Sequence, residues 1–131
     1  MKKMSIIGLL LTALTMGSCQ ESLKEKCARE CRMYTLKNCP AKIDNHTILD
    51  SMIFEDATLT VHYYYTLTGI ADSVGLLTKE EIHKALKDQL RNTTMMRAYK
   101  DEGFNFSYTY HSQSRPELVL AEETLTAKDY Q

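Results

Sequence analysis

Apolar and polar side chains alternate most clearly in residues 58–67, where every odd position is apolar. These positions hold Leu59, Val61, Tyr63, Tyr65 and Leu67. Successive side chains of an extended chain point to opposite faces, so the pattern predicts a strand with one buried face and one polar face. Residues 47–55 are also rich in strand formers, and a short polar link separates the two segments. We expect them to pair as an antiparallel hairpin.

The C-terminal third of the chain repeats this pattern. Aromatic residues occupy every even position from Phe104 to Tyr110, with polar residues between them, and this predicts a third strand. Residues 112–116 predict a turn. Residues 117–126 then predict a fourth strand, followed by a short tail at 129–131.

Residues 20–38 show helical spacing instead of alternation. One apolar stripe would comprise Leu23, Cys27, Cys31 and Tyr34. Ser22 and Glu25 have the spacing of a capping box, which predicts the start of the helix. Asn38 and Pro40 predict its end, because Asn tolerates a left-handed turn and Pro cannot continue a helix.

A second helix is predicted after a loop at residues 68–77. Thr78 and Glu81 have the spacing of another capping box. The apolar stripe behind them comprises Ile82, Ala85, Leu86 and Leu90. Thr94 is placed to cap a short continuation of this helix, which Gly103 would end.

The predicted order of elements is therefore α-β-β-α-β-β. Hairpins imply antiparallel pairing, and amphipathic helices cover one face of such a sheet. We expect an α+β fold with an antiparallel four-stranded sheet, helices packed on one face, and the other face open to water or to a partner. The length of 131 residues suits one small domain.

The first 19 residues have a different character. Lys2 and Lys3 precede an uncharged apolar run, which is too short to span a bilayer and has the length of a secretion signal. The run ends in Met16-Gly17-Ser18-Cys19, which resembles the lipobox of bacterial lipoproteins. The resemblance implies that residues 1–18 are cleaved as a signal peptide, and that Cys19 becomes the lipidated first residue of an exported, membrane-anchored domain at 19–131. The alternative is an ordinary secretory signal with no lipid on Cys19.

Charge narrows the classes of partner. The net charge of −1 falls to −3 when Lys2 and Lys3 are removed with the signal peptide, and the chain has no basic run. Nucleic acid is therefore not an expected partner. We expect a membrane, reached through the lipid on Cys19, and a protein or another component of the cell envelope. No residue pattern implies a cofactor.

Three cysteines remain for the domain if Cys19 carries lipid, and an exported protein can form disulfides. Cys27 and Cys31 lie one helical turn apart and would pair poorly. A turn after the helix would bring Cys39 back, so Cys31–Cys39 is the possible disulfide. One alternative is that Cys27 and Cys31 are small apolar residues of the core. Another is a zinc site with His46 as the fourth ligand.

The polar face of the predicted sheet is the candidate recognition surface, because Tyr64 points outward there beside histidines and hydroxyl-bearing side chains. This surface comprises His62, Tyr64, Thr66, Thr109 and His111. If their strands are neighbours, His62 and His111 could also form an acid–base pair or a metal site. The sequence contains no catalytic motif, so we expect no catalytic residues and no metal.

These observations predict a non-enzymatic envelope module that binds a partner through its exposed sheet face. One alternative is an inhibitor or immunity lipoprotein that blocks an incoming hydrolase, with the loop at 68–77 as its protruding element. Another is a small enzyme or metal-binding protein that uses His62 and His111. Asp50-Ser51-Met52 and Asp72-Ser73-Val74 also resemble O-glycosylation acceptor sites of some exported bacterial proteins, and the second is the better candidate because it lies in a loop.

Overall fold

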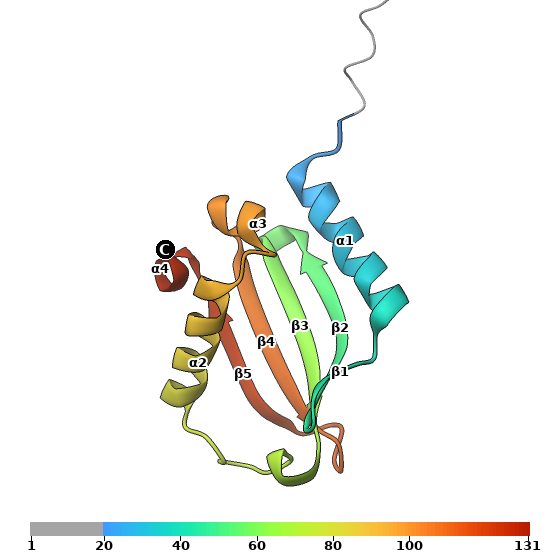
Figure 1. The fold of residues 1–131 in the computed structure, drawn as a ribbon, viewed down its shortest axis with the longest axis vertical. Coiled ribbons are helices and arrows are strands. Elements are labelled where there is room, and N and C mark those ends of the chain that lie inside the picture. Colours follow the sequence, from blue (N-terminus) through green and yellow to red (C-terminus); the bar gives the residue numbers. More distant parts are fainter. Residues whose placement is uncertain (1–19) are drawn as a thin grey trace, which may run out of the picture.

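A computed structural model describes residues 20–131, so the predicted signal peptide and Cys19 lie outside the described residues. The helices are α1 (Leu23–Asn38), α2 (Lys79–Asn92), α3 (Arg97–Asp101) and α4 (Ala127–Tyr130), as Figure 1 shows. The strands are β1 (Ala41–Asp44), β2 (Thr47–Glu55), β3 (Thr60–Leu67), β4 (Asn105–Ser112) and β5 (Val119–Leu125), with 3₁₀ turns η2 (Asp56–Thr58) and η3 (Gly69–Ala71). Within residues 20–131, no helix is long and apolar enough to cross a bilayer.

The five strands form one sheet in the order β1-β2-β3-β4-β5. β2 and β3 form the predicted antiparallel hairpin, and β4 and β5 form a second antiparallel pair. β3 and β4, however, are parallel. The α+β class is therefore confirmed, whereas the prediction of four antiparallel strands in the order α-β-β-α-β-β was wrong.

Each error has a physical cause. Side chains alternate in the same way in parallel and antiparallel strands, so the pattern of β3 and β4 could not show their relative direction. Parallel neighbours need a crossover, and residues 68–104, which contain α2 and α3, supply it. β1 was missed because it has four residues only, directly after Pro40, and pairs with only the first part of β2.

Helix starts were predicted well, and one helix was missed. The capping boxes of α1 and α2 are both present, because Ser22 and Thr78 each exchange two hydrogen bonds with the glutamate three residues later. The continuation begins as α3 after Met96 and not after Thr94. Residues 127–130 form α4 where a tail was expected, because Asp129 forms a third capping box with Thr126.

The core lies between the helices and one face of the sheet. Val61 of β3 and Phe106 of β4 are fully buried at its centre, and the parallel register places Tyr63 beside Tyr108 and Tyr65 beside Tyr110. The ring centroids of these two tyrosine pairs lie 5.0 and 4.8 Å apart. Burial raises the pKa of all four tyrosines, to about 12 for Tyr110, so their hydroxyls stay protonated at neutral pH. The odd positions of 58–67 therefore face the core, as predicted.

The predicted disulfide is not formed. Cys27, Cys31 and Cys39 are all free thiols, and Cys27 and Cys31 are buried in the core stripe of α1. Cys39 caps the end of α1, eight residues beyond Cys31. Eight residues of helix rise about 12 Å, which is beyond the Cα separation that a disulfide can bridge. The chain turns away into β1 and does not fold back over the helix.

α1 closes the edge of the sheet that β1 leaves open. β1 pairs with Thr47, Ile48 and Leu49 only, so the rest of β2 has no strand on the side away from β3. The Thr35 hydroxyl of α1 takes that place. It accepts from the Met52 N–H at 2.9 Å, and its single proton is shared between the Cys31 carbonyl of the same helix at 2.9 Å and the Met52 carbonyl at 3.1 Å. An uncovered strand edge would invite pairing with another chain, and α1 blocks this stretch.

Thr35→Val keeps the shape of this side chain and removes its hydroxyl. The Met52 N–H and carbonyl then lose their partner in a half-buried position, so we expect a loss of about 1–3 kcal/mol in the free energy of unfolding. Urea denaturation measures this loss, provided that the dependence of the free energy of unfolding on urea concentration is unchanged. Thr35→Ser, which keeps the hydroxyl, is the matched control. A valine variant as stable as the serine variant would show that this hydroxyl does not hold the edge.

Candidate functional site

The domain has three surfaces that could serve as a site. The first is the recognition surface predicted from sequence, which lies on the sheet face away from the core. Here His62 Nδ1 is 2.9 Å from a Glu55 carboxylate oxygen, and His62 Nε2 is 2.8 Å from the Thr109 hydroxyl. The Tyr64 ring stacks on His62 with centroids 4.1 Å apart. The fold therefore brings His62, Tyr64 and Thr109 together.

Thr66 and His111 lie further along the same face and pair with each other in the parallel register. The Thr66 hydroxyl donates to Asp50 at 2.7 Å. His111 Nδ1 is buried and has no hydrogen-bond partner among residues 20–131. His62 pairs with Ser107, four positions before His111, which corresponds to about 13 Å along the strand.

The expected closeness of His62 and His111 is therefore not found. The closeness expected from sequence required an antiparallel pair with the two histidines in register, whereas the parallel register places His62 near one end of the paired strands and His111 near the other. Within the described residues, no group of three or more His, Cys, Asp or Glu could hold a metal ion. The alternatives that used the two histidines together, or Cys27, Cys31 and Cys39 with His46, have no geometric support.

The hydrogen bonds of His62 link a carboxylate (Glu55), an imidazole and a hydroxyl (Thr109) in the order used by hydrolases. The Thr109 side chain, however, is only 3% exposed, and its hydroxyl lies 3.3 Å from the Glu122 carboxylate. A substrate would have to displace neighbouring side chains to reach it. The polar groups of this face mostly satisfy one another, so they brace the sheet and offer few free donors to a ligand.

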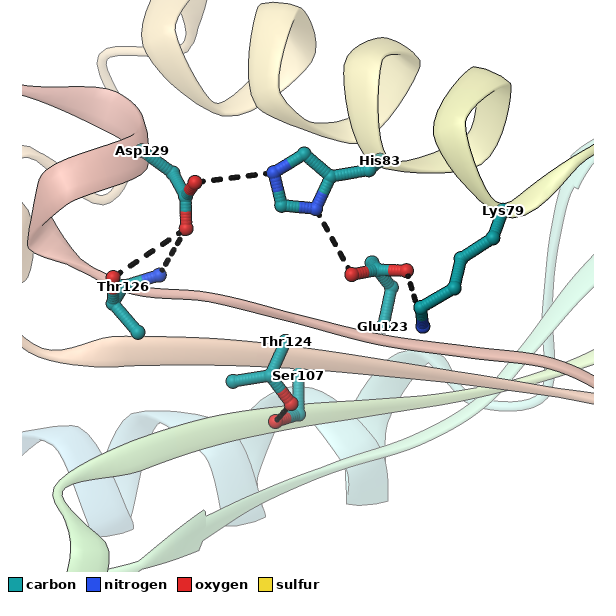
Figure 2. Close-up of polar contacts among 7 residues, drawn as sticks. All are labelled: Lys79, His83, Ser107, Glu123, Thr124, Thr126 and Asp129. Carbon is teal, nitrogen blue, oxygen red and sulfur yellow. Dashed lines mark hydrogen bonds and ion pairs between the residues drawn. The ribbon is translucent and has the colours of Figure 1, made fainter.

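The second surface is an ion cluster that joins α2, β5 and α4 (Figure 2). Glu123 of β5 is only 8% exposed and lies on the core side of the sheet, opposite Tyr108. Its two carboxylate oxygens contact His83 Nδ1 at 2.9 Å and Lys79 Nζ at 3.1 Å. His83 Nε2 is 3.1 Å from Asp129, which also caps α4. This cluster was not predicted from the sequence, because the residues of α2 contact partners that lie 40 or more positions later in the chain.

The cluster shifts the pKa of its members. The hydrogen bond to Glu123 raises the pKa of His83 above its usual value, burial opposes this, and Asp129 adds to it. Burial alone would raise the pKa of Asp129, but hydrogen bonds from Thr126 and His83 lower it overall. His83 contacts a carboxylate at each ring nitrogen, an arrangement that favours its protonated form and ties the last helix to the sheet. We interpret this cluster as a structural clamp.

The third surface is an apolar groove of about 330 Å³ between α2, the loop at 68–77 and the end of the sheet. Ile82, Ala85 and Leu86 of α2 form one wall, and Leu76 and Leu77 of the loop form the other. The remaining lining residues are Thr47, Leu67, Ala71, Ser73, Gly75, Gln89, Tyr110, Leu120 and Ala121. Concave apolar surfaces with a few polar groups are the usual binding sites of proteins, so this groove is the best candidate site.

The sequence held one signal for the groove. Surface loops are seldom rich in large apolar residues, yet this loop has four, all more than half exposed: Ile70, Val74, Leu76 and Leu77. The sequence predicted a protruding loop here only for the inhibitor alternative, and it could not show that part of the loop faces α2. Ser73, the better candidate acceptor for O-glycosylation, is exposed and lines the groove, whereas Ser51 is half-buried within β2.

The clamp predicts a pH dependence of stability. The folded state raises the pKa of His83. The free energy of unfolding that protonated His83 contributes is therefore fully present below the unfolded pKa of about 6.5 and is lost as pH rises through the folded pKa. We expect His83→Gln to destabilise the protein more at pH 5.5 than at pH 9, as measured by urea denaturation. Glu123→Gln should remove the same pH-dependent part of the free energy of unfolding, because it removes the carboxylate that His83 contacts. Glu122→Gln, which is next in the chain but does not contact His83, is the control, and an equal cost at both pH values would contradict the clamp.

Comparison with known proteins supports the fold. A Pseudomonas aeruginosa protein that is inferred to be secreted has a TM-score of 0.65 at 13% identity, covering 86% of this chain and all of that one. The type 2 secretion system pilotin EpsS of Vibrio vulnificus has a TM-score of 0.62 at 11% identity, covering 81% of this chain and 89% of that one. The Vibrio cholerae pilotin AspS has a TM-score of 0.58 at 10% identity, with coverages of 79% and 88%.

At these identities the likeness concerns the fold alone. No curated protein sequence matches the chain. The sequence profile of one family, however, matches residues 22–121, which is most of the described domain. The chain therefore belongs to the family described as a domain of unknown function, DUF8479.

Proposed function

We propose that this protein is a lipid-anchored module of the bacterial cell envelope that binds a helical segment of a partner protein in its apolar groove. The groove between α2 and the loop at 68–77 is the observation that carries the proposal. The lipobox at Met16–Cys19 supports export and anchoring. The groove supports a binding role, because a concave apolar surface can bind a partner without any reactive group.

The surroundings of the groove favour a helix as the bound segment. β3 and β4 are each paired on both sides and offer no edge for an added strand, whereas β5, which contributes Leu120 and Ala121 to the groove, is paired with β4 alone. Apolar side chains of α2 and of the loop form the two walls of the groove, so an extended peptide lying between them would bury backbone groups that only the edge of β5 could pair, which is costly. A helix satisfies its own backbone and can bury an apolar face in the groove.

The comparisons are consistent with this role. Two proteins of the same fold are pilotins of type 2 secretion systems, and a third is inferred to be secreted. For this chain we propose a protein partner on the strength of its groove and by analogy of fold with these proteins.

Lipidation is tested by the intact mass of the protein purified from its native membranes. We expect a mass that matches cleavage before Cys19 with a diacylglyceryl group, and partitioning into the detergent phase. Cys19→Ser is expected to lose both, because the variant has no thiol to acylate. A wild-type protein that is cleaved but carries no acyl chains would contradict the anchor, and it would leave the proposal for the groove standing.

The groove is tested by photo-crosslinking in living cells. A photoreactive residue at Leu77, which lines the groove and is 53% exposed, is expected to give a discrete adduct with one envelope protein. The same residue at Val74, which lies in the same loop outside the groove and is 66% exposed, is the matched control. Leu76→Asp is expected to lower the adduct yield from Leu77 at least about tenfold, equivalent to about 1.4 kcal/mol. Equal adducts from positions 74 and 77 would contradict the proposal.

The sheet face remains the second candidate surface for binding. Ile53 is exposed there beside His62, and the face is not covered by any described helix. We place it second because His62, Thr66 and Thr109 already bond to protein groups. An inhibitor or immunity protein would use the same loop that forms the groove wall, and the crosslinked partner distinguishes it: a hydrolase would favour inhibition.

A further inference from the structure

The two ends of the domain differ in what they carry. Figure 1 shows the start of α1, the turn η2 and α3 at one end of the long axis, and the loop at 68–77 at the other. Lys24 Nζ lies 3.8 Å from Asp56 of η2, and Tyr99 of α3 donates to Glu30 of α1, which fixes the first end. The eight residues of β3 run between the ends and span about 23 Å.

The lipid would attach close to the first end. Cys19 precedes Ser22 by three positions, and Ser22 is held as the N-cap of α1 by its two hydrogen bonds with Glu25. Three residues of chain reach at most about 11 Å. If Cys19 is acylated, this short link cannot hold the start of α1 far from the lipid headgroups.

The corner between α2 and α3 lies at this same end and has the features of a membrane contact. Met95 is 84% exposed at its tip, more than any other large apolar side chain among residues 20–131. Lys100 Nζ donates to the carbonyls of Leu90 and Thr93, at 2.6 and 2.7 Å, so the corner is braced. A rigid corner that presents an apolar tip loses little conformational freedom when the tip is buried.

Two exposed arginines flank the tip. Arg91 and Arg97 line the hollow beside this corner, and Arg91 donates to the Gln131 carbonyl at 3.4 Å. Arginines beside an apolar tip can contact lipid phosphates. Asp101 and Glu102 of the same region are exposed as well, so the positive charge is largely offset. The contact would therefore rest mainly on Met95 and depend only weakly on anionic lipid.

We propose that the α2–α3 corner, residues 93–97, is a second membrane contact of the lipidated protein, with Met95 inserted at the boundary of headgroups and acyl chains. The proposal rests on the lipid anchor of the proposed function. It sets the orientation of the domain: the end with the apolar groove points away from the membrane and toward a partner in the aqueous space.

The absence of Trp from the chain allows a direct test. Met95→Trp places a single fluorophore at the proposed contact, and Ile70→Trp places one on the 79% exposed Ile70 at the opposite end. Both positions are exposed, so both variants should fold, which urea denaturation checks. Each lipidated variant is reconstituted in vesicles of phosphatidylethanolamine, phosphatidylglycerol and chain-brominated phosphatidylcholine.

We expect the emission of the Met95→Trp variant to shift to the blue and to be quenched by the brominated chains. The Ile70→Trp variant should show neither effect and should be quenched by aqueous iodide. If the acylated Met95→Trp variant is quenched by iodide and not by bromine, the membrane contact alone is overturned. Quenching of the Ile70→Trp variant by bromine would reverse the orientation. If the intact mass of the purified protein shows no acyl chains, both the lipid anchor and this membrane contact are overturned.

Discussion

The parallel pairing of β3 with β4 is the constraint on which the rest of the structure depends. It places Tyr63 beside Tyr108 and Tyr65 beside Tyr110, so the aromatic side chains of β3 and β4 stack together in the core. It also obliges residues 68–104 to cross from one end of the sheet to the other. That crossover carries α2 over β5 and leaves the loop at 68–77 beside it. The apolar groove is therefore a product of the crossover.

Helices are attached to the sheet near both of its edges, by different contacts. On the β2 side, one hydroxyl of α1 replaces the hydrogen bonds of a missing strand. On the β5 side, α2 and α4 are joined to the nearly buried Glu123 through His83 and Asp129, with Lys79 as a further partner. A charge that is this buried needs such partners, because an unpaired carboxylate in the core would be strongly destabilising. The polar groups at both sides are thus used by the fold.

This division leaves few free groups for a ligand. On the open face, His62 bonds to Thr109 and Thr66 bonds to Asp50, while His83 of α2 bonds to Glu123 of β5 and Asp129 of α4. The apolar groove at one end and Met95 at the other are the features that the packing of the domain does not explain. Figure 1 shows α3 and the loop at 68–77 at opposite ends of the long axis, so the proposed membrane contact and the proposed binding site would lie at opposite ends of the domain.

The amino-acid sequence by itself determined the local features of this protein. The starts of α1 and α2, the β2–β3 hairpin and the buried face of β3 follow from short-range rules, because capping and alternation depend on neighbours within a few positions. The tertiary structure alone decided the direction of β4 against β3, and with it the separation of His62 from His111. It alone joined His83 to Glu123 and turned Leu76 and Leu77 toward α2. These contacts link residues far apart in the chain, and the pattern of side chains along a strand is the same whichever way its neighbour runs.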